Sequence, residues 1–199
     1  MTNLPVTGSF SITATFGQTG QYWKNGHKGI DIYSDNYDIY ATCYGTVRVV
    51  AFDESGWGQY VSIGDADGYR HIFCHLKKGS VKVKVGDSVT PLTVIGTMGS
   101  TGNSTGIHLH YQVNDKNNNP MDPTAFIGVP NRKGTYKSEE FIIMNFKDQN
   151  EIAEWAEDAV IKVANEGIMV GDKNGNFRPN DNLTRQEAAV IIAKLLERK

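Results

Sequence analysis

The sequence has little that would suggest a disulfide scaffold, a nucleic-acid surface or a membrane segment. Two cysteines among 199 residues are too few for a disulfide framework, and we interpret Cys43 and Cys74 as buried thiols. A net charge of −2 argues against a general nucleic-acid-binding surface. No apolar run approaches the length that crosses a membrane, and residues 1–5 lack the basic and apolar regions of a signal peptide.

Helical periodicity is also absent from residues 7–113. This region is rich in β-branched and aromatic residues that often alternate with polar ones, between clusters of Gly, Asp and Asn. The runs that predict strands are residues 45–52, 59–63, 69–76 and 80–85. Residues 121–126 are predicted to form a short closing element. The pattern favours an antiparallel β domain over a βαβ arrangement.

The pattern changes after residue 146. Apolar residues at helical spacing from Ile152 to Val163 predict a helix that ends at Gly167. Thr184 and Glu187 have the spacing of a capping box, and an apolar stripe follows them. Between the two regions the chain is polar, with Pro and Gly. We therefore predict a mainly β domain over 1–127, a linker over 128–145 and a small all-α module over 146–199.

A Gly-rich loop at residues 99–106 leads into a short strand that carries His108 and His110. Strand side chains alternate, so both imidazoles are expected on one face, roughly 7 Å apart along the strand. Such a pair suits a metal site or an acid–base pair, although an isolated His-x-His also fits two solvent-facing histidines. The loop lacks the Lys of a phosphate-binding loop, and we interpret it as a wall of a substrate groove.

His27 and Asp31 form a second arrangement. In a straight strand their Cα atoms would be about 13 Å apart, too far for both to bind one ion with bonds near 2 Å. The chain must therefore bend between them, and Gly29 permits the bend. In the strand predicted at 69–76, His71, Phe73 and His75 are expected to share one face.

The chain has five histidines, and four of them lie in arrangements that suit zinc. Neutral imidazoles with one carboxylate form a typical zinc set, and a catalytic zinc keeps one position open for water. The candidates outnumber the ligands that one site needs. Some histidines are therefore expected to bind metal and others to transfer protons, and spacing alone does not assign them.

The motifs His27-x-x-x-Asp31, Cys74-His75-Leu76 and His108-x-His110, in this order, resemble the lysostaphin/LytM-type zinc endopeptidases of bacterial cell walls. The resemblance covers residues 17–126 and implies the lysostaphin-type peptidase fold. It implies one zinc ion bound by His27, Asp31 and His110. It also implies that the two remaining matched histidines, His75 and His108, are catalytic.

Other positions depart from that family or have no role in it. The family tolerates many residues at the position of His71, so we expect this side chain to face solvent or the groove. Phe73 and Cys74 stand where the family often has Tyr and a small residue. These departures alter the groove and leave the chemistry in place.

Residues 145–199 resemble a single S-layer homology motif, including Asp148, Gly175–Pro179 and Leu183–Glu187. The resemblance implies binding to a secondary cell-wall polysaccharide, often an anionic one. A guanidinium suits an anionic sugar, so Arg185 is the first candidate contact and Asp148 the second; the alternative is that Arg185 is simply solvated. Gln186 departs from the usual small residue of the signature.

Two further expectations concern this module. The family usually carries three motifs, so a single copy is expected either to bind alone and weakly or to assemble as a dimer or trimer. Residues 172–178 begin like a calcium loop. However, Phe177 and Leu183 occupy the positions that require Gly and Glu, so we expect no functional calcium site.

Together the two resemblances predict a wall hydrolase. It would be a zinc endopeptidase that cleaves stem or crosslink peptide bonds of peptidoglycan, as a phage endolysin or an autolysin. Without a signal peptide, it is expected to be made in the cytoplasm and to act on the wall, unless the sequence is a mature secreted form. The rivals are an inactive wall-binding or regulatory protein and a zinc peptidase that acts on non-wall proteins.

Overall fold

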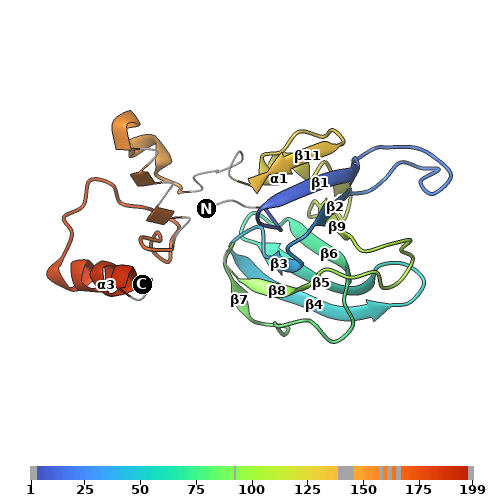
Figure 1. Ribbon diagram of the computed structural model, residues 1–199, viewed down its shortest axis with the longest axis horizontal. Helices are drawn as coiled ribbons and strands as arrows, with labels where there is room; N and C mark the ends of the chain where they lie inside the picture. The colour runs from blue at the N-terminus through green and yellow to red at the C-terminus, as the bar shows by residue number, and fades with distance from the viewer. Residues whose placement is uncertain are drawn as a thin grey trace. The chain divides into compact units, whose positions relative to one another are not determined.

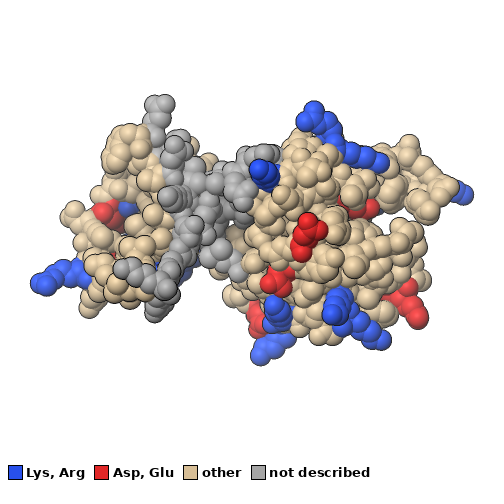
Figure 2. Space-filling view, viewed as in Figure 1, with Lys and Arg blue, Asp and Glu red and all other residues tan. Residues whose placement is uncertain are grey.

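The computed structural model of the chain describes residues 4–91, 93–138, 146–156, 159–160, 163–164 and 167–196. The chain divides into two compact units, Thr2–Phe141 and Ile142–Lys199 (Figure 1). No helix in the described ranges is both long enough and apolar enough to cross a membrane. On the face of the first unit seen in Figure 2, acidic and basic side chains are interspersed.

The first unit is built on a nine-stranded sheet in the order β11-β1-β2-β9-β6-β5-β4-β7, with β10 pairing with β9. Two shorter strands, β3 (Asp38–Tyr40) and β8 (Val94–Thr97), form a second sheet. The strands of the large sheet are β1 Ser9–Ala14, β2 Ile30–Ser34, β4 Gly45–Asp53, β5 Gly58–Asp65, β6 Arg70–Leu76, β7 Ser88–Val89, β9 Leu109–Asn114, β10 Pro120–Met121 and β11 Gly134–Lys137. Every strand pair among the described residues is antiparallel. The predicted antiparallel β domain is therefore confirmed.

The core lies between the two sheets, because strand alternation directs every second side chain to that side. Ile39 of β3 and Ile95 of β8 join the same buried cluster as Phe73 of β6 and Tyr111 of β9. Burying a side chain of this size contributes roughly 1.5–3 kcal/mol. The opposite side chains of β9 are polar, and this strand lies between β2 and β6. Residues distant in the sequence therefore meet on one face.

Two expectations about this unit are wrong. Residues 80–84 have no regular secondary structure, and Val85 lies in a turn. Val81 and Val83 pack on the core and Lys82 donates its N–H to the Ile95 carbonyl at 3.0 Å, but no regular ladder follows.

Residues 134–137 of the predicted linker form β11, which pairs with β1 (Figure 1). This is an edge strand with mostly exposed side chains, so its composition is that of a loop. The predicted closing element is β10 followed by the short helix α1 (Thr124–Ile127).

The second unit contains the 3-10 turns η2 (Gln149–Glu151) and η3 (Glu154–Ala156) and the helix α3 (Arg185–Leu196). The predicted capping box is confirmed: Glu187 N–H donates to Thr184 Oγ1 at 3.2 Å, and Thr184 N–H donates to Glu187 Oε2 at 2.9 Å. The helix predicted from Ile152 to Val163 lies partly outside the described residues; Ala159, Val160, Val163 and Ala164 are helical. Long loops connect these elements, so an all-α module remains a prediction.

Candidate metal centre

Three side-chain atoms meet at the junction of β2 and β9. Asp31 of β2 is directly opposite His110 of β9, and His27 precedes β2 in a loop. His27 Nε2 lies 3.0 Å from His110 Nδ1 and 3.2 Å from Asp31 Oδ1, and His110 Nδ1 lies 3.0 Å from Asp31 Oδ1. All three residues are buried. The predicted bend between His27 and Asp31 is therefore confirmed.

Gly29 lies in this bend. A glycine is needed there because a side chain would not fit, not because the backbone conformation requires one. Its backbone is not in the left-handed region that favours glycine. A Cβ atom here would clash with the Tyr111 carbonyl oxygen and would lie 2.9 Å from Cε1 and Nε2 of the His110 ring. The absence of a side chain at Gly29 thus lets the His27 segment pack directly over His110.

The hydrogen bonds on the outer side of each ring determine which atoms face the junction. His27 Nδ1 lies 3.0 Å from the Thr15 carbonyl oxygen, and His110 Nε2 lies 3.3 Å from Gln112 Oε1. Both partners are oxygen acceptors, so in each neutral imidazole the outer nitrogen carries the proton. The inner nitrogens then direct lone pairs toward each other and toward the Asp31 carboxylate. Three acceptors at one point match a cation.

The electrostatics and dimensions of the junction agree with this conclusion. Burial raises the pKa of Asp31, but the adjacent His110 and His27 rings outweigh it and hold that pKa well below the ordinary value. The carboxylate is therefore ionised at neutral pH. In a tetrahedral zinc site with bonds of 2.0–2.1 Å, ligand atoms lie about 3.3 Å apart. The observed separations of 3.0–3.2 Å are close to this value, so the three residues fit a zinc ion.

His75 and His108 lie beside this junction. Their ring centroids are 4.8 Å apart, and His108 Nε2 lies 3.8 Å from Asp31 Oδ1. His75 Nδ1 lies 2.8 Å from the Thr101 carbonyl oxygen, and His108 Nδ1 lies 2.9 Å from the Gly106 carbonyl oxygen. In each neutral ring Nδ1 therefore carries the proton, and Nε2 is left as the acceptor. The structure thus gathers all five residues that the resemblance singles out.

His75 reaches the junction because its backbone is in the left-handed region, with φ of 61°. This conformation costs energy for a residue other than glycine. A hydrogen bond from the His75 backbone N–H to the Trp57 carbonyl oxygen, at 2.8 Å, stabilises it. The expectation that His71, Phe73 and His75 share a face is therefore wrong. His71 and Phe73 pack near the Tyr111 ring on the core side, whereas His75 lies near His108 and His110.

The expectation that His71 faces solvent or the groove is also wrong. His71 is 1% exposed. Its Nδ1 lies 2.7 Å from the Tyr111 hydroxyl and 3.1 Å from Thr42 Oγ1, and its Nε2 lies 3.3 Å from Asp65 Oδ2. Its partners come from distant segments, so the strand pattern alone did not reveal that both ring nitrogens are used inside the core.

The pKa of His75 is lowered to about 4, mainly by burial and also by the nearby His108 and His110, against the opposing hydrogen bond to the Thr101 carbonyl. His75 is therefore neutral at physiological pH. A neutral imidazole with its Nδ1 proton engaged presents the Nε2 lone pair, which can accept a proton or bind a metal ion.

A cleft of about 420 Å³ opens over these residues. Asn103–Ile107 line it, so the Gly-rich loop forms a cleft wall as expected. Tyr22, Trp23 and Tyr33 also line it, and the Trp23 ring centroid lies 4.5 Å from that of His27. Sequence reasoning missed these aromatic residues, because no motif marks a loop residue that folds back over a metal ligand.

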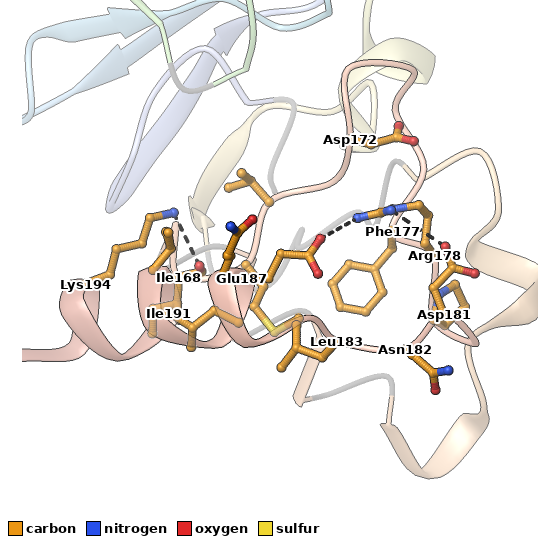
Figure 3. A pocket seen from close by; sticks show the side chains of 15 residues that line it. Ile168, Asp172, Phe177, Arg178, Asp181, Asn182, Leu183, Glu187, Ile191 and Lys194 are labelled. Atoms are coloured by element: carbon orange, nitrogen blue, oxygen red, sulfur yellow. Dashed lines mark hydrogen bonds and ion pairs between the residues drawn. The ribbon is translucent and has the colours of Figure 1, made fainter.

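The second unit has a separate pocket of about 430 Å³ beside α3, lined mainly by apolar side chains (Figure 3). Its charged groups are engaged within the unit. Arg178 forms ion pairs with Glu187 at 3.1 Å and with Asp181 at 3.6 Å, and Lys194 Nζ donates to the Gly167 carbonyl oxygen at 2.8 Å. The pocket therefore presents an apolar interior with paired charges.

The two predicted polysaccharide-binding residues lie outside this pocket's lining. Arg185 is exposed at the first turn of α3. Both carboxylate oxygens of Asp148 accept backbone N–H groups, from Phe177 at 2.8 Å and from Arg178 at 2.7 Å. Asp148 therefore anchors the loop before α3, a structural function that the sequence pattern did not indicate.

Comparison with known proteins agrees with this geometry. Residues 25–123 match the profile of peptidase family M23, and residues 145–189 match the S-layer homology domain. The L-Ala–D-Glu endopeptidase of Bacillus subtilis is 33% identical over 101 residues, which cover 50% of this chain and 31% of that protein. The catalytic domain of lysostaphin from Staphylococcus simulans has a TM-score of 0.53 at 30% identity, covering 58% of this chain and 90% of that one.

A third relative is the outer membrane protein SlpA of Deinococcus radiodurans. It is 49% identical over 43 residues, which cover 22% of this chain and 4% of that protein. The chain spans less than a third of the length of the curated relatives that it matches. The similarity to each relative is thus one of segments rather than of whole proteins.

Proposed function

The chain belongs to peptidase family M23 and carries an S-layer homology domain, and from this premise we propose that it is a zinc-dependent endopeptidase of bacterial peptidoglycan. The observation that carries the proposal is the convergence of His27 Nε2, His110 Nδ1 and Asp31 Oδ1 at separations of 3.0–3.2 Å. Relatives named L-Ala–D-Glu endopeptidase and lysostaphin support the substrate class.

The proposed roles follow from the positions of the side chains. His27, Asp31 and His110 would hold one zinc ion and leave a coordination position open toward the cleft. Zinc in such a site acts as a Lewis acid toward water and toward a carbonyl oxygen. A ligand set of two imidazoles and one ionised carboxylate requires no further protein donor.

His75 and His108 would then move protons. Each holds its Nδ1 proton on a backbone carbonyl and directs Nε2 as an acceptor. We assign to these Nε2 atoms the acceptance of the proton from the attacking water and its later delivery to the leaving amine. The low pKa of His75, about 4, keeps this residue neutral for the first task.

The cleft would hold the peptide chain across the zinc site. Its neutral lining of Tyr22, Trp23, Tyr33 and Asn103–Ile107 offers ring faces, hydroxyls and amides to an extended peptide. The cleaved bond, in a stem or a crosslink, would be selected by these residues.

The S-layer homology domain would hold the enzyme on wall polysaccharide. The exposed guanidinium of Arg185 is the proposed contact with an anionic sugar. Asp148 would act by fixing the loop that contains Phe177 and Arg178. A wall peptidase joined to a wall-binding domain would act as a phage endolysin or an autolysin.

The experiment is clearing of purified sacculi by the full chain. We expect turbidity to fall and free amino groups, not reducing sugars, to appear. A chelator should stop the reaction and zinc should restore it. Arg185→Ala should reduce sedimentation with the sacculi while leaving zinc content unchanged. Sacculi that bind the zinc-loaded protein but release no amino groups would identify a binding protein instead, and cleavage of proteins without wall clearing would identify a different peptidase.

A further inference from the structure

One face of β9 carries three buried polar side chains in succession. His110, Gln112 and Asn114 are 8%, 5% and 3% exposed, respectively. Burying polar groups is costly unless each one is hydrogen-bonded. Only His110 belongs to the proposed zinc site, so the other two require a separate explanation.

These side chains are bonded in series. Gln112 Nε2 donates to Asn114 Oδ1 at 2.7 Å, and Asn114 Nδ2 donates to Asn118 Oδ1 at 3.0 Å. Arg70 Nη1 also donates to Asn118 Oδ1, at 3.0 Å. At the other end, Gln112 Oε1 lies 3.3 Å from His110 Nε2. The series therefore runs from Arg70 on β6 to the metal centre.

The direction of the series is fixed at its outer end. A guanidinium only donates hydrogen bonds, so Arg70 holds the oxygen of Asn118 toward itself and toward Asn114. Asn114 must then use its amide nitrogen on Asn118 and its oxygen on Gln112. Gln112, in turn, uses its nitrogen on Asn114 and is left with its oxygen facing His110. His110 Nε2 can satisfy that oxygen only by donating a proton.

The other histidines of the centre are oriented in a different way. Backbone carbonyl oxygens of Thr15, Thr101 and Gly106 accept the outer ring proton of His27, His75 and His108, respectively. These three therefore bond through Nδ1 and face the junction with Nε2. His110 is reversed: it faces the junction with Nδ1, and among the described residues its outer nitrogen has the Gln112 side chain as its hydrogen-bond partner.

We propose that Arg70, Asn118, Asn114 and Gln112 form a polarised relay that places the proton of His110 on Nε2 and thereby presents Nδ1 to the zinc ion. The relay acts by positioning and touches neither substrate nor zinc. This inference rests on the proposed zinc site. Outer partners of metal-binding histidines typically contribute 10–100-fold to metal affinity, and here the immediate partner is the Gln112 amide, which three hydrogen bonds connect to Arg70.

The test compares variants with the wild type by two measurements. Competition with a chromophoric chelator gives the zinc affinity, and long-range ¹H–¹⁵N correlation at pH 8 gives the tautomer of His110. Gln112→Leu removes the acceptor and should weaken zinc binding about 10–100-fold and let the metal-free ring populate both tautomers. Gln112→Glu keeps an acceptor oxygen toward His110 but gives up the donor to Asn114, so it should restore the Nε2–H form and most of the affinity that Gln112→Leu loses. Asn118→Gly, which suits the left-handed backbone at that residue (φ 67°), should give a smaller loss of the same kind.

Ser62→Ala is the matched control. Ser62 is fully buried on β5, in register with Ile72, which is itself in register with Gln112. Its hydroxyl has no hydrogen-bond partner among the described residues, so its removal should leave zinc affinity unchanged. Equal zinc affinity for Gln112→Leu and the wild type, or equal losses for Gln112→Leu and Gln112→Glu, would overturn the relay. A wild-type protein that binds no zinc would instead refute the proposed function, and the tautomer of metal-free His110 would still test the relay.

Discussion

The first unit contains two pairs of histidine and aspartate on opposite faces of one sheet. His110 and Asp31 are both buried, whereas in the other pair His71 is buried and Asp65 is half-buried. On the core face, His71 lies 3.3 Å from Asp65 and contacts two hydroxyl groups. On the cleft face, His110 lies 3.0 Å from the Asp31 carboxylate. The residue types and the distances are similar, so neither feature distinguishes a functional pair from a structural one.

The two pairs differ in whether every hydrogen-bond acceptor around them has a donor. The hydroxyl groups of Thr42 and Tyr111 both donate and accept, so the network around His71 closes on itself. At the cleft, the outer ring nitrogens are bound to acceptors, and the inner ones face a carboxylate. A closed network stabilises a fold, whereas a cluster with an excess of acceptors is a site for a cation.

Identical substitutions in the two pairs should give the largest contrast. Asp31→Asn removes the ionised ligand of the junction and should lower zinc affinity by more than the about 10–100-fold that a lost outer partner costs, with no detectable wall clearing. Asp65→Asn should leave zinc stoichiometry and clearing unchanged. Isothermal titration of the metal-free proteins with zinc measures the affinity and stoichiometry, and the turbidity of sacculi measures the clearing. Zinc binding that survives Asp31→Asn but is lost in Asp65→Asn would reverse our assignment of the two faces.

A smaller effect is expected at the histidines that bind no metal. His108→Ala and His75→Ala should each retain zinc and lower kcat about 10²–10⁴-fold, as expected for lost acid–base function. His71→Gln keeps a polar side chain on the core face and should leave kcat at the wild-type level. Steady-state release of amino groups, with the zinc content of each variant measured in parallel, is the assay. Full activity of zinc-loaded His108→Ala would remove that residue from the mechanism.

Much of this contrast was predictable from the sequence. The order of motifs and the strand periodicity around His108 and His110 predicted the antiparallel sheet and the residues at the centre. The resemblance singled out His75, and the structure places its ring beside those of His108 and His110, for geometric reasons that periodicity does not contain. Its left-handed backbone breaks the alternation, so a regular strand places it on the wrong face. His71 was misplaced because the resemblance gave its position no role, and the regular pattern grouped it with His75 on one face.

Other features depended on tertiary partners that lie far apart in the chain. β11 is polar because it is an edge strand, and only its pairing with β1 distinguishes it from a linker. The relay behind His110 joins two residues of β9 to Arg70 and to Asn118 in the next turn. Alternation predicts that Gln112 shares a face with His110, but whether that face is buried depends on what the fold packs over it.

The smallest effect concerns the stability of the core-face pair, and it should depend on pH. Burial raises the pKa of Asp65, but hydrogen bonds from His71 and from the backbone of Tyr69 and Asp67 hold it below its ordinary value. Because the folded-state pKa is depressed, the stabilisation is present above the unfolded pKa of about 3.9. It is lost as the pH falls through the folded value.

We therefore expect wild type to exceed Asp65→Asn by about 1 kcal/mol in unfolding free energy at pH 6, since the carboxylate is partly open to solvent and the amide keeps one acceptor oxygen. This difference in unfolding free energy should become smaller below about pH 4. Urea titrations of the metal-free proteins between pH 6 and pH 2.5 measure it. Chelator competition on the same samples at pH 6 should give equal zinc affinities. A gap that stays constant to the lowest pH would mean that the carboxylate charge does not stabilise this face, and the core-face network would then rest on its hydroxyl groups alone.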